Sequence, residues 1–230
     1  MSIDLSICMT VKDWSKVDSG QGVRYYLPNT VRAIALSLLP GDSVEIVVSD
    51  WASTDWPLAE WIHQMAVPAT VKIVPMDGPF CVGRGKNYSA DSATKDMLLF
   101  IEGDVLVDRE ALLDGCAAVA KGLVYFANIW WLTNPEHTEG SFFGGLGTTF
   151  IRKDTFLRSG GFPEYGSHGM CDVIWHHRVD AQAPCLIQNV RSIQHQWHPR
   201  EDEWLNRNYG AGWVADHQEK MSKWHLGTLT

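Results

Sequence analysis

Short apolar runs alternate with helix-like segments through the first half of the chain, and this alternation constrains the fold more than any other feature. The runs have the length of buried strands and lie at residues 5–11, 44–48, 71–74 and 97–101. The segments between them, at residues 28–39, 57–66 and 86–95, have the punctuation of helices. Strands that alternate with helices predict an α/β domain with a mostly parallel, Rossmann-like central sheet and right-handed crossovers.

The alternation weakens after Asp108, which predicts a second half of mixed architecture. The expected elements there are helices and strands of unequal length around a polar, glycine-containing loop: a helix at 109–121, a strand at 123–129, the loop at 134–145, a strand at 148–151, a helical turn at 153–158, a helix at 171–181 and a strand at 185–190. A chain of 230 residues suits one large domain of this kind.

An acid-x-acid triplet, Glu102-Gly103-Asp104, directly follows the apolar run at residues 97–101. Ligands of open α/β sheets bind beyond the carboxyl ends of the strands, and residues i and i+2 of an extended segment point the same way. Glu102 and Asp104 can therefore converge on one divalent cation that carries a phosphate, and Mg²⁺ or Mn²⁺ suits such oxygen ligands. A solvated acidic turn that closes the strand is the simpler alternative. Asp13 and Asp50 follow two other predicted strands and are expected along the same edge.

The charge and the cysteines narrow the classes of function. Nineteen basic against 27 acidic side chains give a net charge of −8, which argues against a broad electrostatic contact with nucleic acid or with an anionic membrane. Five scattered cysteines without a C-x-x-C pair predict neither a disulfide framework nor a thiolate zinc site. No apolar run approaches the length of a membrane span, and no secretory signal is evident. These features favour a cytoplasmic location.

Five segments, taken in order, resemble the family 2 glycosyltransferases of the GT-A fold, which use nucleotide-sugar donors. Residues 47–55 are similar to the family's V-V-D-D-G-S-T-D signature, although Trp51 and Ala52 replace its second acid and its glycine. Residues 83–87 resemble its G-x-x-x-A-R-N segment, and residues 102–104 its D-x-D motif with Glu102 in the first position. The remaining two are Gly160-Gly161-Phe162-Pro163-Glu164, similar to G-G-F-D-E, and Gly169-Met170-Cys171-Asp172, where the family has G-x-E-D.

The resemblance implies a single GT-A domain, residues 1–230, with a nucleotide-sugar-binding half at about 1–108 and an acceptor half with a C-terminal tail at about 109–230. It implies a metal-dependent transferase that uses Mn or Mg and, by default, a UDP-sugar. The donor-binding candidates are polar residues at strand ends and in the basic segment: Asp13, Asp50, Arg84, Lys86, Asn87, Glu102 and Gly103. The candidate metal ligands are Asp104, Glu102, His195 and His198.

The acceptor and the base are expected in the second half. Asp172 matches the acid that often serves as the catalytic base, which predicts inversion of configuration. The acceptor-binding candidates are two tryptophans, two glycines and one acid: Trp130, Trp131, Gly144, Gly145 and Glu164. Carbohydrates or other hydroxyl-bearing molecules are the expected acceptors, and nucleic acid stays among them.

Each assignment has a simpler alternative in the sequence. Arg84 and Lys86 could instead be solvated loop residues. Asp50 could be a turn residue, and Asp172 could be a helix cap. The whole chain could also be a non-catalytic module that binds nucleotide-sugar or carbohydrate, an alternative favoured by Cys171 in the family's Glu position. A sugar-phosphate nucleotidyltransferase is less favoured, because the segment after the first predicted strand lacks glycine.

Overall fold

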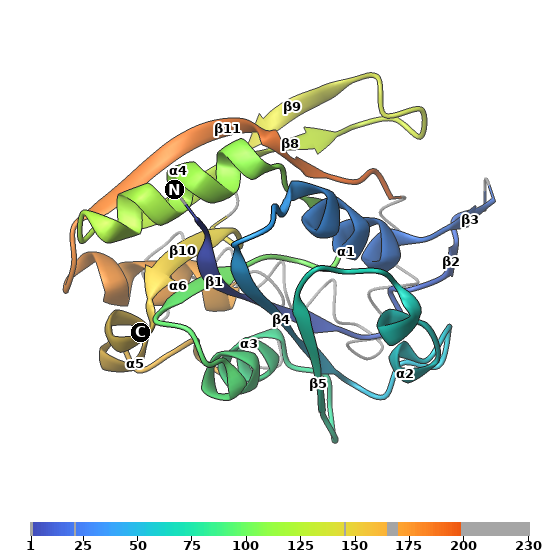
Figure 1. Ribbon diagram of the computed structural model, residues 1–230, viewed down its shortest axis with the longest axis horizontal. Helices are drawn as coiled ribbons and strands as arrows, with labels where there is room; N and C mark the ends of the chain where they lie inside the picture. The colour runs from blue at the N-terminus through green and yellow to red at the C-terminus, as the bar shows by residue number, and fades with distance from the viewer. Residues whose placement is uncertain (1, 21, 145, 165–169, 199–230) are drawn as a thin grey trace.

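The computed structural model describes residues 2–20, 22–144, 146–164 and 170–198, which form one α/β unit (Figure 1). The strands are β1 (Asp4–Val11), β2 (Val17–Asp18), β3 (Val23–Arg24), β4 (Ser43–Asp50), β5 (Thr70–Pro75), β6 (Met97–Phe100), β7 (Val105–Leu106), β8 (Val124–Leu132), β9 (Gly140–Phe143), β10 (Thr149–Arg152) and β11 (Cys185–His195). The helices are α1 (Tyr26–Ser37), α2 (Leu58–Trp61), the 3-10 turn η1 (Ile62–Gln64), α3 (Val82–Ser92), α4 (Arg109–Ala120), α5 (Lys153–Arg158) and α6 (Met170–Asp180). Within this part of the chain, no helix is long and apolar enough to cross a membrane.

The main sheet has a parallel half and a mixed half, as the alternation and its loss after Asp108 predict. Its order is β5-β4-β1-β6-β10-β8-β11-β7, and β9 pairs with β8. The first four of these strands pair with one another in parallel. β10 then runs antiparallel to both β6 and β8, whereas β11 is parallel to β8 and antiparallel to β7.

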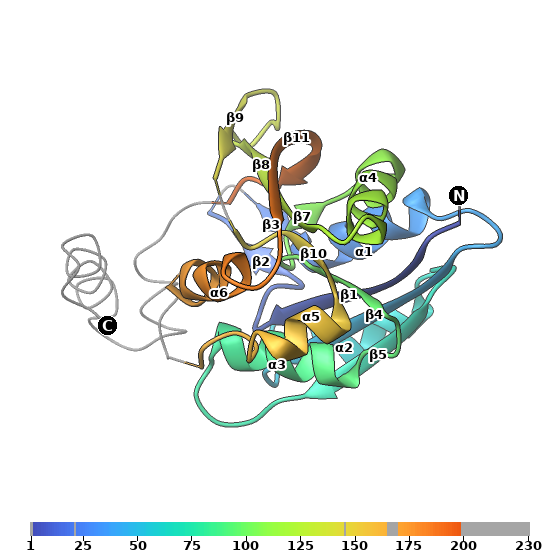
Figure 2. The same ribbon diagram turned by 90° about the vertical axis from the view of Figure 1, so that its left-hand side faces the viewer.

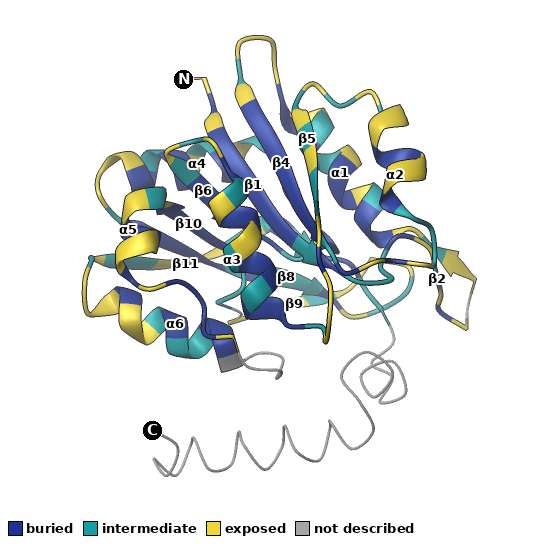
Figure 3. Ribbon diagram, turned by 90° about the horizontal axis from the view of Figure 1, so that it is seen from below, coloured by how far each residue is buried: buried dark blue, intermediate teal, exposed yellow. Residues whose placement is uncertain are grey.

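Helices cover both faces of this sheet, and each face has its own apolar core. α1 and α4 lie on one face, where Ile34 and Leu112 pack with the strands in the larger core. α3, α5 and α6 lie on the other face, where Phe100, Phe126 and Trp175 form the centre of the second core (Figure 2). β1 and β4 are buried along almost their whole length between these layers (Figure 3). Strands buried on both faces read as unbroken apolar runs, which is why the sequence locates them well.

The whole segment at residues 83–87 is helical, because α3 begins at Val82, four residues before its expected start at residue 86. α3 begins at Val82, where the Sγ of Cys81 accepts a hydrogen bond from the backbone N–H of Arg84. Gly83 and Gly85 suggested a loop because glycine is a poor helix former. In the structure these two glycines allow close packing, since a Cβ on Gly85 would overlap the side chain of Thr10 and a Cβ on Gly83 would overlap the carbonyl of Pro163.

Other boundaries differ from the expected ones for local reasons. The helix expected at 57–66 is split into α2 and η1. The loop expected at 134–145 contains β9, which pairs with β8 as a hairpin. β11 continues to His195, five residues beyond its expected end, because a bulge after Val190 lets pairing with β8 resume at Gln194.

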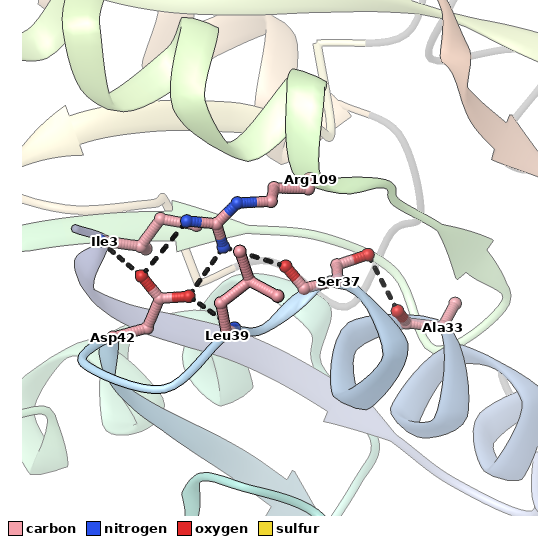
Figure 4. Close-up of polar contacts among 6 residues, drawn as sticks. All are labelled: Ile3, Ala33, Ser37, Leu39, Asp42 and Arg109. Carbon is pink, nitrogen blue, oxygen red and sulfur yellow. Dashed lines mark hydrogen bonds and ion pairs between the residues drawn. The ribbon is translucent and has the colours of Figure 1, made fainter. Parts of the chain in front are cut away.

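A buried carboxylate ties the amino end of the sheet to α4 (Figure 4). Asp42 accepts hydrogen bonds from the backbone N–H groups of Ile3 and Leu39 and pairs with Arg109 at 2.6 Å. The Asp42 side chain is only 2% exposed. The hydrogen bond from Arg109 is the main reason that the pKa of Asp42 lies far below its ordinary value.

We expect Asp42→Asn to lower the free energy of unfolding at pH 7 by about 1–3 kcal/mol, because the partly buried Arg109 loses its charged partner. A carboxylate with a depressed folded-state pKa stabilises the protein above its unfolded-state pKa of about 3.9, and this contribution falls away as the pH drops toward the folded-state pKa. The gap between wild type and variant, measured by urea denaturation, should therefore narrow below about pH 4. Asp154→Asn is the matched control, because Asp154 pairs with Arg158 at an exposed position and should change stability little. If wild type and Asp42→Asn differ in free energy of unfolding by the same amount at pH 7 and pH 3, the stabilising role assigned to the Asp42 carboxylate is contradicted.

Candidate functional site

Carboxylates follow three neighbouring parallel strands at the same edge of the sheet. Asp13 follows β1, Asp50 ends β4, and Glu102 and Asp104 follow β6. The carboxyl ends of these strands meet there because β4, β1 and β6 run in parallel. The structure thus brings the acid pair and the two other acidic strand ends to one edge, as expected.

Two histidines reach the acid pair because of a strand of two residues. β7 directly follows the acid turn and pairs antiparallel with the end of β11, so that His195 lies opposite Val105. This register places the imidazole of His195 beside the carboxylate of Asp104, with 3.4 Å between His195 Nε2 and Asp104 Oδ2. His198 Nε2 lies 3.7 Å from the same oxygen.

These three side chains form a cluster with the composition of a metal site. One ligand atom from each of Asp104, His195 and His198 lies within 4.8 Å of the others. Asp104 and His195 are buried, 5% and 2% exposed, and within the described residues Asp104 Oδ1 and His195 Nδ1 have no hydrogen-bond partner. A carboxylate with two imidazoles suits Mn²⁺ and related divalent cations, so the residues fit the expected metal.

Glu102 lies at the margin of this cluster and is the more exposed acid. Its Oε2 is 3.9 Å from His195 Nε2, and its side chain is 33% exposed. Its Oε1 lies on the other side, toward Gly147. Glu102 is therefore placed between the metal cluster and the neighbouring Asp172.

Aromatic side chains pack around the cluster, and one of them bonds to it. The indole N–H of Trp14 donates to Asp104 Oδ2 at 3.0 Å, and Trp14 stacks on Tyr26. Burial raises the pKa of Tyr26 to about 12, so this phenol stays neutral. Trp131 stacks on the His195 ring with 3.7 Å between centroids. Sequence reasoning missed Trp14 as a site residue, although it lies one position beyond Asp13, which was a candidate.

Asp172 forms a buried ion pair with Lys86. The distance from Lys86 Nζ to Asp172 Oδ1 is 2.6 Å, and the Lys86 side chain is 1% exposed. Burial alone would lower the pKa of Lys86, but the carboxylate of Asp172, with that of Glu102, raises it above its ordinary value. Lys86 is thus a buried cation in α3, which rules out the alternative of a solvated loop residue.

The second carboxylate oxygen of Asp172, Oδ2, faces the same space as Glu102. A Cβ on Gly147 would lie 3.4 Å from Glu102 Oε1 and 3.9 Å from Asp172 Oδ2. Gly147 therefore leaves room beside both carboxylates. Burial and the adjacent Asp172 raise the pKa of the Cys171 thiol far above its ordinary range, so Cys171 contributes no charge here.

The other donor-binding candidates are held by local contacts. The Arg84 guanidinium donates to the carbonyl of Asp77 at 2.8 Å and lies over the Trp51 ring. Asn87 donates to the carbonyl of Phe162 and to Glu164 Oε1, each at 2.9 Å. Asn87 and Glu164, predicted for donor and acceptor respectively, therefore contact each other.

Asp13 and Asp50 both organise the loop after β4. Asp13 has a positive φ of 52° and its Oδ1 accepts from the backbone N–H of Thr54. Asp50 Oδ1 accepts from the backbone N–H and the hydroxyl of Ser53. These contacts hold residues 51–55 across the carboxyl ends of β1 and β4.

The acceptor candidates lie on and near the β8–β9 hairpin. Trp130 packs against Phe142 and lies under the guanidinium of Arg191, on the face of β8 opposite to Trp131. Of these two tryptophans, Trp131 is the one that stacks on a histidine of the cluster, His195. Gly144 lies near the side chain of Asn128, whereas Gly145 lies outside the described residues.

Comparisons with solved structures identify the fold. The chain superposes on the 1–349 fragment of TarS from S. aureus in complex with UDP-GlcNAc with a TM-score of 0.70 and 15% identity, over 94% of this chain and 64% of that one. It superposes on the mannosyltransferase PcManGT from Pyrobaculum calidifontis, in complex with GDP-Man and Mn²⁺, with a TM-score of 0.64 and 15% identity, over 97% of this chain and 65% of that one. The chain thus spans less than two thirds of either structure. Neither protein-family models nor curated protein sequences match it.

These likenesses establish the fold. The chain has the GT-A fold, a curved sheet with a parallel first half and a mixed second half flanked by helices, as the sequence predicts.

Proposed function

We propose that this chain is a metal-dependent glycosyltransferase, which moves a sugar from a nucleoside diphosphate donor to an acceptor hydroxyl. The observation that carries the proposal is the cluster of Asp104, His195 and His198 at the carboxyl edge of a GT-A sheet. Two solved structures of the same fold support it, because one holds UDP-GlcNAc and the other holds GDP-Man together with Mn²⁺. We take a UDP-sugar as the default donor.

The donor half, about residues 1–108, would hold the nucleotide and the diphosphate. Asp13 and Asp50, with the loop they organise, would contact the base and the ribose; their contacts with Thr54 and Ser53 support this by fixing that loop. Asp104, His195 and His198 would hold Mn²⁺ or Mg²⁺, with Glu102 beside them. When bound, such a cation neutralises the charge that builds on the leaving diphosphate. Gly103 does not open space at the turn as expected, because a Cβ there would lie 2.9 Å from Val11 Cγ1, so its role is to let the turn pack against β1. Arg84 and Asn87 are retained as donor candidates through the α3 amino terminus, whose backbone N–H groups favour phosphate.

Asp172 is our candidate for the general base of an inverting reaction. Lys86 occupies its Oδ1, which leaves Oδ2 directed toward the space beside Gly147 and Glu102. The acceptor hydroxyl would give its proton to Asp172 Oδ2 while its oxygen forms the new bond to the anomeric carbon and the bond to the diphosphate oxygen breaks. The buried ammonium of Lys86, 2.6 Å from Asp172 Oδ1, would hold this carboxylate in its orientation between turnovers.

The acceptor half, from about residue 109, would bind a carbohydrate or another hydroxyl-bearing molecule. Trp131 lies against His195, and Trp130 lies on the opposite face of β8, so the hairpin offers an aromatic surface on either side. Planar aromatic rings suit sugar faces. Gly144, Gly145 and Glu164 complete the proposed acceptor side.

A turnover assay tests the proposal. The full chain is incubated with UDP-sugars and GDP-sugars in Mn²⁺, in Mg²⁺ and in EDTA, and release of the nucleoside diphosphate is measured with and without a panel of carbohydrate acceptors. We expect release from one donor, dependent on the cation and increased by an acceptor. Tight binding of a donor without any release would instead identify a non-catalytic binding module.

A further inference from the structure

One helix, α1, is hydrogen-bonded to both segments that carry the cluster of Asp104, His195 and His198. These segments are the acid turn and the segment that holds the two histidines. The hydroxyl of Thr30, in α1, donates to the carbonyl of Gly103 at 3.0 Å. The side-chain amide of Gln196 donates to the carbonyl of Tyr26 at 3.1 Å and to Thr30 Oγ1 at 3.3 Å. The backbone N–H of Gln196 donates to the carbonyl of Asp104 at 2.9 Å.

These bonds form a continuous chain between two segments that are far apart in the sequence. Thr30 lies at its centre, because its hydroxyl donates to the acid turn and accepts from Gln196. Asn29 completes the contact by donating to Gln196 Oε1 at 3.0 Å. Thr30 is fully buried and Gln196 is 1% exposed, so water does not replace the bond between these two side chains if it is lost, whereas Asn29 is exposed.

We propose that Thr30 and Gln196 are positioning residues that set the affinity of the cluster for its cation. The inference rests on the metal site of the proposed function. Gln196 lies between the ligands His195 and His198, and Thr30 holds the residue before Asp104. Together they fix the separation between the carboxylate and the two imidazoles before a cation arrives. Groups that orient metal ligands without touching the metal typically change metal affinity by about 10–100-fold when they are removed.

The same helix offers a matched control two turns further on. Ser37 donates to the carbonyl of Val107 at 3.0 Å. It also donates to the carbonyl of Ala33 at 2.9 Å (Figure 4). This bond joins α1 to the same stretch of chain that Thr30 contacts, but beyond the site. Loss of either hydroxyl removes a buried hydrogen bond, and only the loss at Thr30 should reach the metal ligands.

The experiment titrates the full chain with Mn²⁺ and detects free Mn²⁺ by electron paramagnetic resonance, so that the readout does not depend on turnover. Thr30→Val and Gln196→Met should each weaken Mn²⁺ affinity about 10–100-fold. Thr30→Ser, which restores the hydroxyl, and Ser37→Ala should stay within about threefold of wild type. Thermal unfolding should show that Thr30→Val and Ser37→Ala lower stability to a similar extent.

The outcomes separate this inference from the proposed function. Wild-type affinity in Thr30→Val and Gln196→Met, with Mn²⁺ binding intact in the wild type, would overturn the positioning role and leave the metal site standing. Equal losses in Thr30→Val and Ser37→Ala would overturn it as well, because the effect would then follow stability. Absence of Mn²⁺ binding in the wild type would overturn both. If neither buried variant folds, Asn29→Ala decides, since it removes only the bond to Gln196 Oε1 and should weaken Mn²⁺ binding severalfold.

Discussion

Replacement of Asp104 by asparagine is expected to lower turnover at least about a thousandfold and to remove Mn²⁺ binding. Asparagine keeps the shape of the side chain and an oxygen that can accept the indole N–H of Trp14. It loses the negative charge on which the two imidazoles converge. A cation at a leaving phosphate supplies several kcal/mol of stabilisation, and about 4 kcal/mol corresponds to roughly a thousandfold in rate.

Glu102→Gln is the matched control for this prediction. Glu102 is more exposed than Asp104, and its carboxylate lies at the margin of the cluster. We expect a loss of about tenfold in turnover, with Mn²⁺ affinity reduced less than in Asp104→Asn. The reverse order, with the larger loss in Glu102→Gln, would show that Glu102 is the principal ligand.

Replacement of Asp172 by asparagine is expected to lower kcat by about 10²–10⁴-fold, the range for loss of a general base, and to leave Mn²⁺ affinity and donor KM close to wild type. The reason for this separation is geometric. Asp172 Oδ2 faces the space beside Gly147, whereas the metal cluster lies on the other side of Glu102. Rates and donor binding are measured on the same preparation.

The ion pair with Lys86 requires a control for stability. Asp172→Asn leaves a buried ammonium without its partner, which typically costs about 3–5 kcal/mol. The double variant Lys86→Met/Asp172→Asn removes both charges and should recover most of that stability without recovering activity. A stable double variant with near wild-type kcat would sink the assignment of Asp172 as base, and it would leave the metal site unaffected.

The parallel half of the fold is predictable from the sequence because most of its strands are buried on both faces. β1, β4 and β6 are almost wholly buried and mainly apolar, whereas the edge strand β5 is partly exposed; each of the four ends within a few residues of its expected boundary. The same runs place the acidic residues at their ends, so the edge that carries Asp50 and Asp104 follows from the pattern alone.

The second half is less predictable because its pairing depends on long-range contacts. β7 has two residues and no recognisable pattern, yet its pairing with β11 places His195 beside Asp104. The sequence indicated these histidines only through a family resemblance. The roles of Thr30 and Gln196 had no signal at all, since a buried threonine in a helix and a glutamine between two histidines are both ordinary.

Glycine was misleading at one point for a physical reason. Gly85 lies inside α3 because the helix packs directly on Thr10 and Trp51, where no side chain fits. A pattern of glycines with basic residues is equally typical of a phosphate-binding loop. The early start of α3 at Val82 matters for Lys86, because the helix directs its side chain into the interior against Asp172.

The measurement that tests the central claim most directly is a calorimetric titration of the full chain with UDP-sugars and GDP-sugars, each in Mn²⁺ and in EDTA, together with the same titration of Asp104→Asn. We predict that one nucleotide sugar binds in Mn²⁺, that EDTA removes the binding, and that Asp104→Asn does not bind it in either condition. Failure of every nucleotide sugar to bind in Mn²⁺, or binding that is indifferent both to the cation and to Asp104, would contradict the assignment of this GT-A domain as a metal-dependent glycosyltransferase.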